Sequence, residues 1–295
     1  MSGAAYLRAR DLDEALEAAG RDGAAVLAGG TDLVTRVRRG HDAPTVLVDV
    51  RRALPVGVNA TGEGIEIGAG TTLAAVAADP GVQERYGVLA RAAQGAASPQ
   101  LRATGTVGGN LAQHVRCWYY RHPDLRCWLH GGDTCYAQIG DHRKHGLEAG
   151  DCISVAPSDL AAALVALGAT VELRSAGGGA RTLELHDLYR RPSEEQRSSL
   201  ALAPGELIVR VVPGAPPDAS AYERAGERAA WSFALVGVAA ARRGAEVRLC
   251  AIGVTNEPRL LDPADPLRGL DGLPQTGWKR DLLGELCARA LAAVA

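Results

Sequence analysis

The run Ala-Ala-Val-Leu-Ala-Gly-Gly-Thr-Asp-Leu, residues 24–33, places two glycines between a short apolar segment and a segment of helical character. We expect a strand over 24–27 and a helix over 32–39. Glycines let a backbone approach a pyrophosphate closely, and the amides at the start of a helix favour an anion. An ordinary strand-to-helix turn has the same composition, and the run matches neither a Gly-x-Gly-x-x-Gly fingerprint nor a Walker loop. Residues 29–32 are therefore a candidate phosphate-binding loop, and a second motif is needed to support that interpretation.

The segments around this run predict a β-α-β-type unit followed by mixed strands and helices. A helix is expected over 11–19, further strands over 45–50 and 64–67, and helices over 71–78 and 88–97.

A second glycine-rich turn, Gly-Thr-Val-Gly-Gly-Asn at 105–110, follows about 75 residues later. Two such loops could hold the two ends of one dinucleotide, with Thr31, Thr106 and Asn110 as hydrogen-bond donors. The pair favours a bound nucleotide more strongly than either loop does alone, and tight turns without a ligand remain the alternative.

Four of the six cysteines lie in one unusual segment, at Cys117, Cys127, Cys135 and Cys152. Residues 112–156 show neither helical nor strand periodicity, and such a long irregular span inside a domain is disordered or functional. Its Trp, Tyr and Cys content argues against disorder. The remaining thiols, Cys250 and Cys287, lie in apolar patterns and are expected in the core.

The cysteine spacings of 10, 8 and 17 residues contain no Cys-x-x-Cys knuckle, which argues against an ordinary structural zinc site. An iron–sulfur cluster with four thiolate ligands tolerates such spacing. Two alternatives stay open, a mixed Cys/His zinc site and free buried thiols. The zinc alternative arises because five of the seven histidines share the segment: His114, His122, His130, His142 and His145.

The second half of the chain is predicted to alternate helices and strands, with a domain boundary between 178 and 179. Asp159 lies in Pro-Ser-Asp-Leu, where it suits a helix cap as well as a functional carboxylate. The expected elements are helices over 160–167, 229–241 and 278–294, and strands over 170–173, 206–212 and 246–255.

Composition restricts the class of partner. The chain has 295 residues, of which 47% are hydrophobic and 22% charged, and its net charge of −2 gives no electrostatic case for nucleic acid or an anionic membrane. The N-terminus lacks the apolar run of a signal peptide, and no stretch is long enough to span a bilayer. We therefore expect a cytoplasmic protein without nucleic-acid or membrane partners, in which the clustered thiols stay reduced and are better read as ligands than as disulfides.

Several of these segments, taken together and in order, resemble the FAD-binding subunit of the molybdenum hydroxylases. This family includes the flavin subunits of xanthine dehydrogenase, carbon monoxide dehydrogenase and aldehyde oxidoreductases. The segments are Val-Leu-Ala-Gly-Gly-Thr-Asp-Leu (26–33), Arg102 with Thr-Val-Gly-Gly-Asn-Leu (106–111), Pro-Ser-Asp-Leu (157–160) and Phe-Ala-Leu-Val (233–236).

The cysteine segment narrows the resemblance to one branch. Residues 113–121 and 152–159 are similar to an insertion in the flavin subunits of periplasmic-type aldehyde oxidoreductase and 4-hydroxybenzoyl-CoA reductase, which carry an extra [4Fe–4S] cluster. Two features depart from the family pattern. Arg224, in Tyr-Glu-Arg (222–224), stands where the motif usually ends in lysine, and the segment 260–275 is short.

The resemblance implies an α+β fold in two domains. The first, residues 1–178, would be an FAD-binding domain of the PCMH type, made of two α/β subdomains, with the iron–sulfur insertion at about 112–156. The second, residues 179–295, would be a smaller α+β domain of the carbon monoxide dehydrogenase flavoprotein type, with an antiparallel sheet and helices.

The resemblance also implies the cofactor sites, FAD and the cluster. Cys117, Cys127, Cys135 and Cys152 would be the iron ligands. The FAD site would consist of Val26, Leu27, Ala28, Gly29, Gly30, Thr31, Asp32 and Leu33, then Thr106, Val107, Gly108, Gly109 and Asn110, and finally Asp159 and Arg224.

The function implied is an electron-transfer subunit of a molybdenum-dependent oxidoreductase. Its partners would be a large subunit with the molybdenum cofactor and a small iron–sulfur subunit with two clusters, from which electrons would reach this FAD and then an external acceptor. Two alternatives belong to other classes: a stand-alone flavin-dependent oxidoreductase acting on a small molecule, and a zinc-stabilised binding module.

Overall fold

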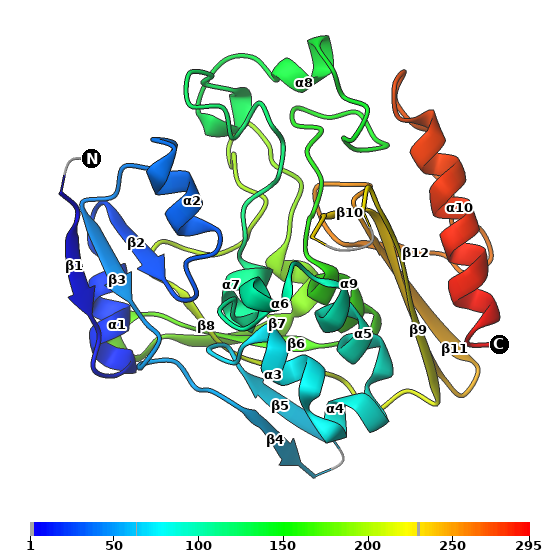
Figure 1. Cartoon of the computed structure of the whole chain (residues 1–295), viewed down its shortest axis with the longest axis horizontal. Helices are drawn as coiled ribbons and strands as arrows, with labels where there is room; N and C mark the ends of the chain where they lie inside the picture. The colour runs from blue at the N-terminus through cyan, green and yellow to red at the C-terminus, as the bar shows by residue number, and fades with distance from the viewer. Residues whose placement is uncertain (1–2, 63, 229–230) are drawn as a thin grey trace.

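Three β-sheets and the helices between them are formed by the residues that the structure describes (Figure 1). The computed structural model describes residues 3–62, 64–228 and 231–295. The mixed α/β architecture with antiparallel sheets that the resemblance implied is confirmed.

The first sheet is parallel, in the order β1-β3-β2, and contains the predicted β-α-β unit. Helix α1 begins where Asp11 accepts a hydrogen bond from Glu14 N at 2.9 Å. The predicted elements over 11–19, 24–27, 32–39 and 45–50 are confirmed within one or two residues. The elements are β1 (Ala5–Arg8), α1 (Leu12–Ala19), β2 (Ala24–Leu27), α2 (Leu33–Arg38) and β3 (Val46–Asp49).

The second sheet is antiparallel, in the order β4-β5-β8-β6-β7. Its strands are β4 (Val58–Thr61), β5 (Gly64–Gly68), β6 (Thr170–Arg174), β7 (Ala180–Glu184) and β8 (Leu207–Val212). The accompanying helices are α3 (Leu73–Ala78), α4 (Pro80–Arg85), α5 (Gly87–Gly95), α6 (Pro99–Arg102), α7 (Val107–Leu111) and α9 (Asp159–Ala166).

Strand β8 lies in the middle of this sheet, between β5 and β6. The sheet therefore uses the chain up to residue 212, and the predicted boundary at 178/179 falls between the paired strands β6 and β7. We propose that the division between domains follows β8 rather than β6.

The third sheet is antiparallel, in the order β12-β11-β10-β9. Helix α10 (Gly277–Ala292) packs on it, and α9, buried along its whole length, contacts β10 and β11. The predicted core positions of Cys250 and Cys287 are confirmed. The strands are β9 (Ala219–Gly226), β10 (Ala234–Arg243), β11 (Glu246–Ile252) and β12 (Arg259–Leu261).

The helix predicted over 229–241 is wrong, because residues 234–243 form β10, and 229–230 lie outside the described residues. Val236 and the run 238–241 are buried on both faces of the strand. A strand buried on both faces reads as a continuous apolar run, which periodicity cannot separate from a buried helix.

The cysteine segment lies between α7 and α9 and is drawn at the top of Figure 1. Between residues 112 and 158 its regular structure is limited to a 3-10 turn at Trp128–His130 and the four-residue helix α8 (Tyr136–Ile139). Backbone hydrogen bonds from Leu147 N to Val254 O and from Ala156 N to Thr255 O fasten it to the third sheet. The prediction that this segment is irregular is confirmed.

Candidate functional site

The two predicted glycine loops touch each other. A Cβ added to Gly29 would lie 2.2 Å from the carbonyl oxygen of Thr104, immediately before the second loop. Gly30 has a φ of +70°, a conformation that a side chain with a Cβ rarely adopts. Glycine is therefore required at both positions, at Gly29 by close approach and at Gly30 by backbone conformation.

A cavity of about 190 Å³ opens beside these loops. Eight of the predicted FAD residues line it, while Leu27, Thr31, Thr106, Val107 and Asn110 belong to the same loops but not to its lining. The lining residues are Val26, Ala28, Gly29, Gly30, Asp32, Leu33, Arg36, Val50, Leu54, Gly108, Gly109, Ala112, Gln113, Leu202, Glu206, Leu207 and Ile208.

No sequence motif predicts that three of these residues line the cavity. Leu202 precedes β8 and Ile208 lies within it, about 170 residues after the first loop, and Arg36 lies one turn into α2. The strand order, which places β8 in the middle of the sheet, brings Leu202 and Ile208 to the glycines.

Asn110 is tied to the start of α9. Its Oδ1 accepts a hydrogen bond from Ser158 Oγ at 2.6 Å, and Ser158 Oγ in turn accepts from Ala161 N at 3.1 Å. Ser158, rather than Asp159, caps this helix. The second glycine loop and the Pro-Ser-Asp segment, which the sequence presented as separate motifs, therefore form one unit.

The carboxylate of Asp32 faces arginines of the cysteine segment. Its Oδ1 lies 2.9 Å from Arg116 Nη1 and 2.7 Å from Arg121 Nη2, and its Oδ2 accepts from His114 N at 3.1 Å. Burial raises the pKa of Asp32, but Arg116 and Arg121 outweigh that effect and, with the His114 amide, lower the pKa to about 2. Asp32 therefore links the first loop to the cysteine segment.

Asp159 forms an ion pair with the last residue of the Tyr-Glu-Arg motif. Its Oδ1 accepts from Tyr222 Oη at 2.6 Å and from Arg224 Nε at 2.9 Å, which joins α9 to β9. Burial raises the pKa of Asp159, and Arg224 opposes that effect. Neither Asp159 nor Arg224 lines a cavity described here, and the cofactor contacts of both stay predictions.

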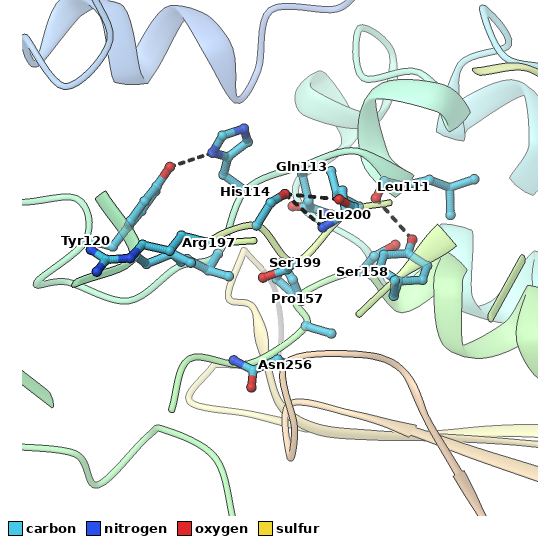
Figure 2. Close-up of a pocket in the computed structure, with 15 residues that line it drawn as sticks. Leu111, Gln113, His114, Tyr120, Pro157, Ser158, Arg197, Ser199, Leu200 and Asn256 are labelled. Carbon is cyan, nitrogen blue, oxygen red and sulfur yellow. Dashed lines mark hydrogen bonds between the residues drawn. The ribbon is translucent and has the colours of Figure 1, made fainter. Parts of the chain in front are cut away.

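A second cavity, of about 80 Å³, lies between the end of α7, the cysteine segment and the start of α9 (Figure 2). Tyr120 and His114 are paired in its wall, with Oη and Nδ1 2.6 Å apart, and Asn256 reaches it from the loop after β11. Gln113 lines both this cavity and the larger one, so the two are neighbours along one surface.

All four predicted cysteine ligands line a third, small cavity of about 10 Å³. Cys127 and Cys152 are buried, and Cys117 and Cys135 are partly exposed. The other lining residues are Tyr119, Tyr120, Leu129, Tyr136, Ala137 and Ser154. The structure thus brings together four thiols that are far apart in the sequence.

The four thiols differ in their pKa values and in their hydrogen bonds. Burial raises the pKa of Cys117 to about 12. Cys135 and Cys152 share a hydrogen bond, which lowers the pKa of Cys135 and raises that of Cys152. Within the described ranges, no group of three or more His, Cys, Asp or Glu side chains is arranged to hold a single metal ion.

The chain is similar to known proteins. The family model "FAD binding domain in molybdopterin dehydrogenase" matches residues 2–213. The aldehyde oxidoreductase FAD-binding subunit PaoB of Escherichia coli K12 is 36% identical over 263 residues, which are 86% of this chain and 81% of that protein. The nicotinate dehydrogenase FAD-subunit of Eubacterium barkeri is 26% identical over 72% of this chain and 58% of its own length.

The fold also matches solved structures. The chain superposes with a TM-score of 0.73 on a carbon monoxide dehydrogenase from Hydrogenophaga pseudoflava, with 21% identity, covering 99% of this chain and 96% of that one. In the part of the chain that the structure describes, no helix has the length and apolar character needed to cross a membrane.

Proposed function

Because the chain belongs to the family of FAD-binding subunits of molybdenum hydroxylases, we propose that it carries both FAD and a [4Fe–4S] cluster and transfers electrons within a molybdenum-dependent oxidoreductase. The single observation that carries this proposal is the proximity of two sites. Asp32 lines the glycine-lined cavity, and its ion pairs with Arg116 and Arg121 reach the segment whose four cysteines line the small cavity.

The residues around the large cavity fit FAD. A Cβ added at Gly29 would collide with the backbone of Thr104. A Cβ added at Gly108, which lines the same cavity, would lie 3.0 Å from Cβ of Ala69. Both loops therefore present backbone without side chains at these positions. Bare backbone permits the close approach that a pyrophosphate requires. The residues 26–33 and 106–110 would hold the cofactor, and bound FAD would supply the one- and two-electron chemistry.

The cysteines supply the ligand type that an iron–sulfur cluster requires. Zinc–sulfur bonds of about 2.3 Å would require four thiolates to converge closely, and no such group exists among the described residues. Four Cys thiolates are the ligand set of a [4Fe–4S] cluster, and four cysteines line this one cavity. Cys117, Cys127, Cys135 and Cys152 would be its ligands.

Similar proteins support a proposal about the partner subunits of this chain. One relative is the FAD-binding subunit of an aldehyde oxidoreductase, and one solved structure that is similar to this chain belongs to a carbon monoxide dehydrogenase. We propose that this chain likewise assembles with a large subunit that binds the molybdenum cofactor and a small iron–sulfur subunit with two clusters. Electrons would pass between the small subunit, this chain and an external acceptor.

Purification from the native host under anaerobic conditions tests this function. Large and small subunits are expected to co-purify with the chain. The separated chain is expected to oxidise a reduced artificial donor but not to turn over aldehydes, purines or aromatic thioesters. Steady oxidation of an organic substrate by the chain alone, without molybdenum, would instead establish a stand-alone flavin-dependent oxidoreductase.

A further inference from the structure

One of the four cysteines has an imidazole against its sulfur. Nε2 of His145 lies 3.2 Å from Sγ of Cys117, although 28 residues separate them in the sequence. The His145 ring is buried and meets the edge of Trp118, with ring centroids 4.8 Å apart and an interplanar angle of 86°. The contact is therefore held away from water.

The hydrogen-bonding pattern favours one direction for this contact. Nδ1 of His145 is buried and has no partner among the described residues. A proton on Nδ1 would leave a buried donor unpaired, at a cost of about 1–3 kcal/mol. A proton on Nε2 has Cys117 Sγ as its acceptor and leaves only a bare lone pair on Nδ1.

The C-terminal helix holds this histidine in place. Lys279, on α10, is fully buried, and its Nζ donates to His145 O at 2.7 Å, to Lys144 O at 3.3 Å and to Gly253 O. Three carbonyl acceptors match the three hydrogens of an ammonium group. The backbone of His145 is thus tied both to its own turn and to the third sheet.

We propose that His145 is a positioning residue that donates its Nε2–H to the thiolate of Cys117 and thereby raises the reduction potential of the cluster. The inference rests on the proposed function, because it requires Cys117 to be an iron ligand. A hydrogen bond to a ligating sulfur stabilises the more negative, reduced state, and hydrogen bonds to sulfur are a known determinant of cluster potentials.

Other residues supply the comparison variants. Glutamine can place its Nε2 where the imidazole Nε2 lies, so His145→Gln keeps a donor that His145→Leu removes. His122 belongs to the same segment but is half-exposed, and its Nδ1 accepts a hydrogen bond from Asp124 N rather than contacting a sulfur. His122→Leu is therefore the matched control for the loss of a histidine.

The test is a redox titration of the cluster in anaerobically purified holoprotein, followed by electron paramagnetic resonance, with iron and sulfide measured first. His145→Leu is expected to keep its iron and to shift the equilibrium toward the oxidised cluster about tenfold, which corresponds to about 59 mV for one electron. His145→Gln should have a potential close to that of the wild type, and His122→Leu should show no shift. An unchanged potential in an iron-replete His145→Leu protein overturns the inference.

A second measurement covers the case in which His145→Leu fails to hold its cluster. In wild-type protein with ¹⁵N-labelled histidine, electron spin-echo spectroscopy of the reduced cluster should detect a nitrogen coupling that disappears in His145→Gln. Absence of that coupling in an iron-replete wild-type protein overturns the inference. Wild-type protein without iron would instead contradict the proposed function itself.

Discussion

Arg121 donates a hydrogen bond from Nη2 to Oδ1 of Asp32 at 2.7 Å, across 89 residues of sequence. Asp32 ends the first glycine loop, and Arg121 lies between the first two cysteines of the irregular segment. With Arg116 and Arg36, also paired to Asp32, three arginines surround one partly buried carboxylate. The proposed FAD loop and the proposed cluster segment are therefore coupled through a single side chain.

Removing this carboxylate charge should destabilise both regions together. Asp32→Asn leaves the partly buried Arg116 and Arg121 without their carboxylate partner, while Arg36 keeps Asp42. Breaking a fully buried ion pair costs about 3–5 kcal/mol, which is the upper bound here. We expect urea-induced unfolding at a lower midpoint and reduced FAD and iron contents. Asp124→Asn, at an exposed position of the same segment, is the control and should change little. Equal stability of the two variants would remove Asp32 from the link.

The same carboxylate should make stability depend on pH. The pKa of Asp32 is about 2 in the folded protein, below its ordinary value of 3.8. A lowered pKa contributes stability that is fully present above the unfolded value and is lost as the pH falls through the folded value. Between about pH 5 and pH 2, the free energy of unfolding should drop by on the order of 2 kcal/mol more in wild type than in Asp32→Asn. Parallel pH profiles for the two proteins would contradict this assignment.

A side chain at Gly30 should block FAD binding. Gly30 and Gly40 both have left-handed backbone, with φ values of +70° and +72°, so valine costs about 1–2 kcal/mol of strain at either position. The new Cβ would meet Val34 and Leu27 at Gly30 but nothing within 4 Å at Gly40. Gly30→Val should bind FAD at least tenfold more weakly in a titration, and Gly40→Val should bind it normally. Normal binding by Gly30→Val would place the cofactor elsewhere.

The cysteines divide into two groups that iron analysis can separate. Serine at Cys117, Cys127, Cys135 or Cys152 should lower the iron content and loosen residues 112–156, because metal binding there takes the place of a local core. Serine at Cys250 or Cys287, which are buried in apolar clusters, should destabilise the fold without loss of iron from the protein that remains folded. The reverse pattern would show that the wrong thiols were assigned.

Local signals made the first glycine loop predictable. A short apolar strand, two glycines and an amphipathic helix are each encoded within a few residues, and the structure has them at 24–27, 29–30 and 33–38. The strand at 234–243 was not predictable in this way, because its small apolar residues are buried on both faces and carry no period.

The site was predictable as a set of motifs but not as an arrangement. The sequence pointed to four cysteines and two loops, yet nothing local indicated that Asp32 would turn toward Arg116 and Arg121, or that Ile208 would line the cavity. His145 stood out only as one histidine of five in its segment. These contacts depend on strand order and on the course of an irregular segment, which are properties of the whole fold.

The most direct test of the central claim is the cofactor content of anaerobically purified wild-type protein, with Cys127→Ser as its control. The account predicts one FAD released per chain on denaturation, together with about four iron and four sulfide per chain, and much less iron in the variant with its FAD largely retained. A colourless wild-type protein containing zinc, or one that binds neither flavin nor iron after reconstitution, would contradict it.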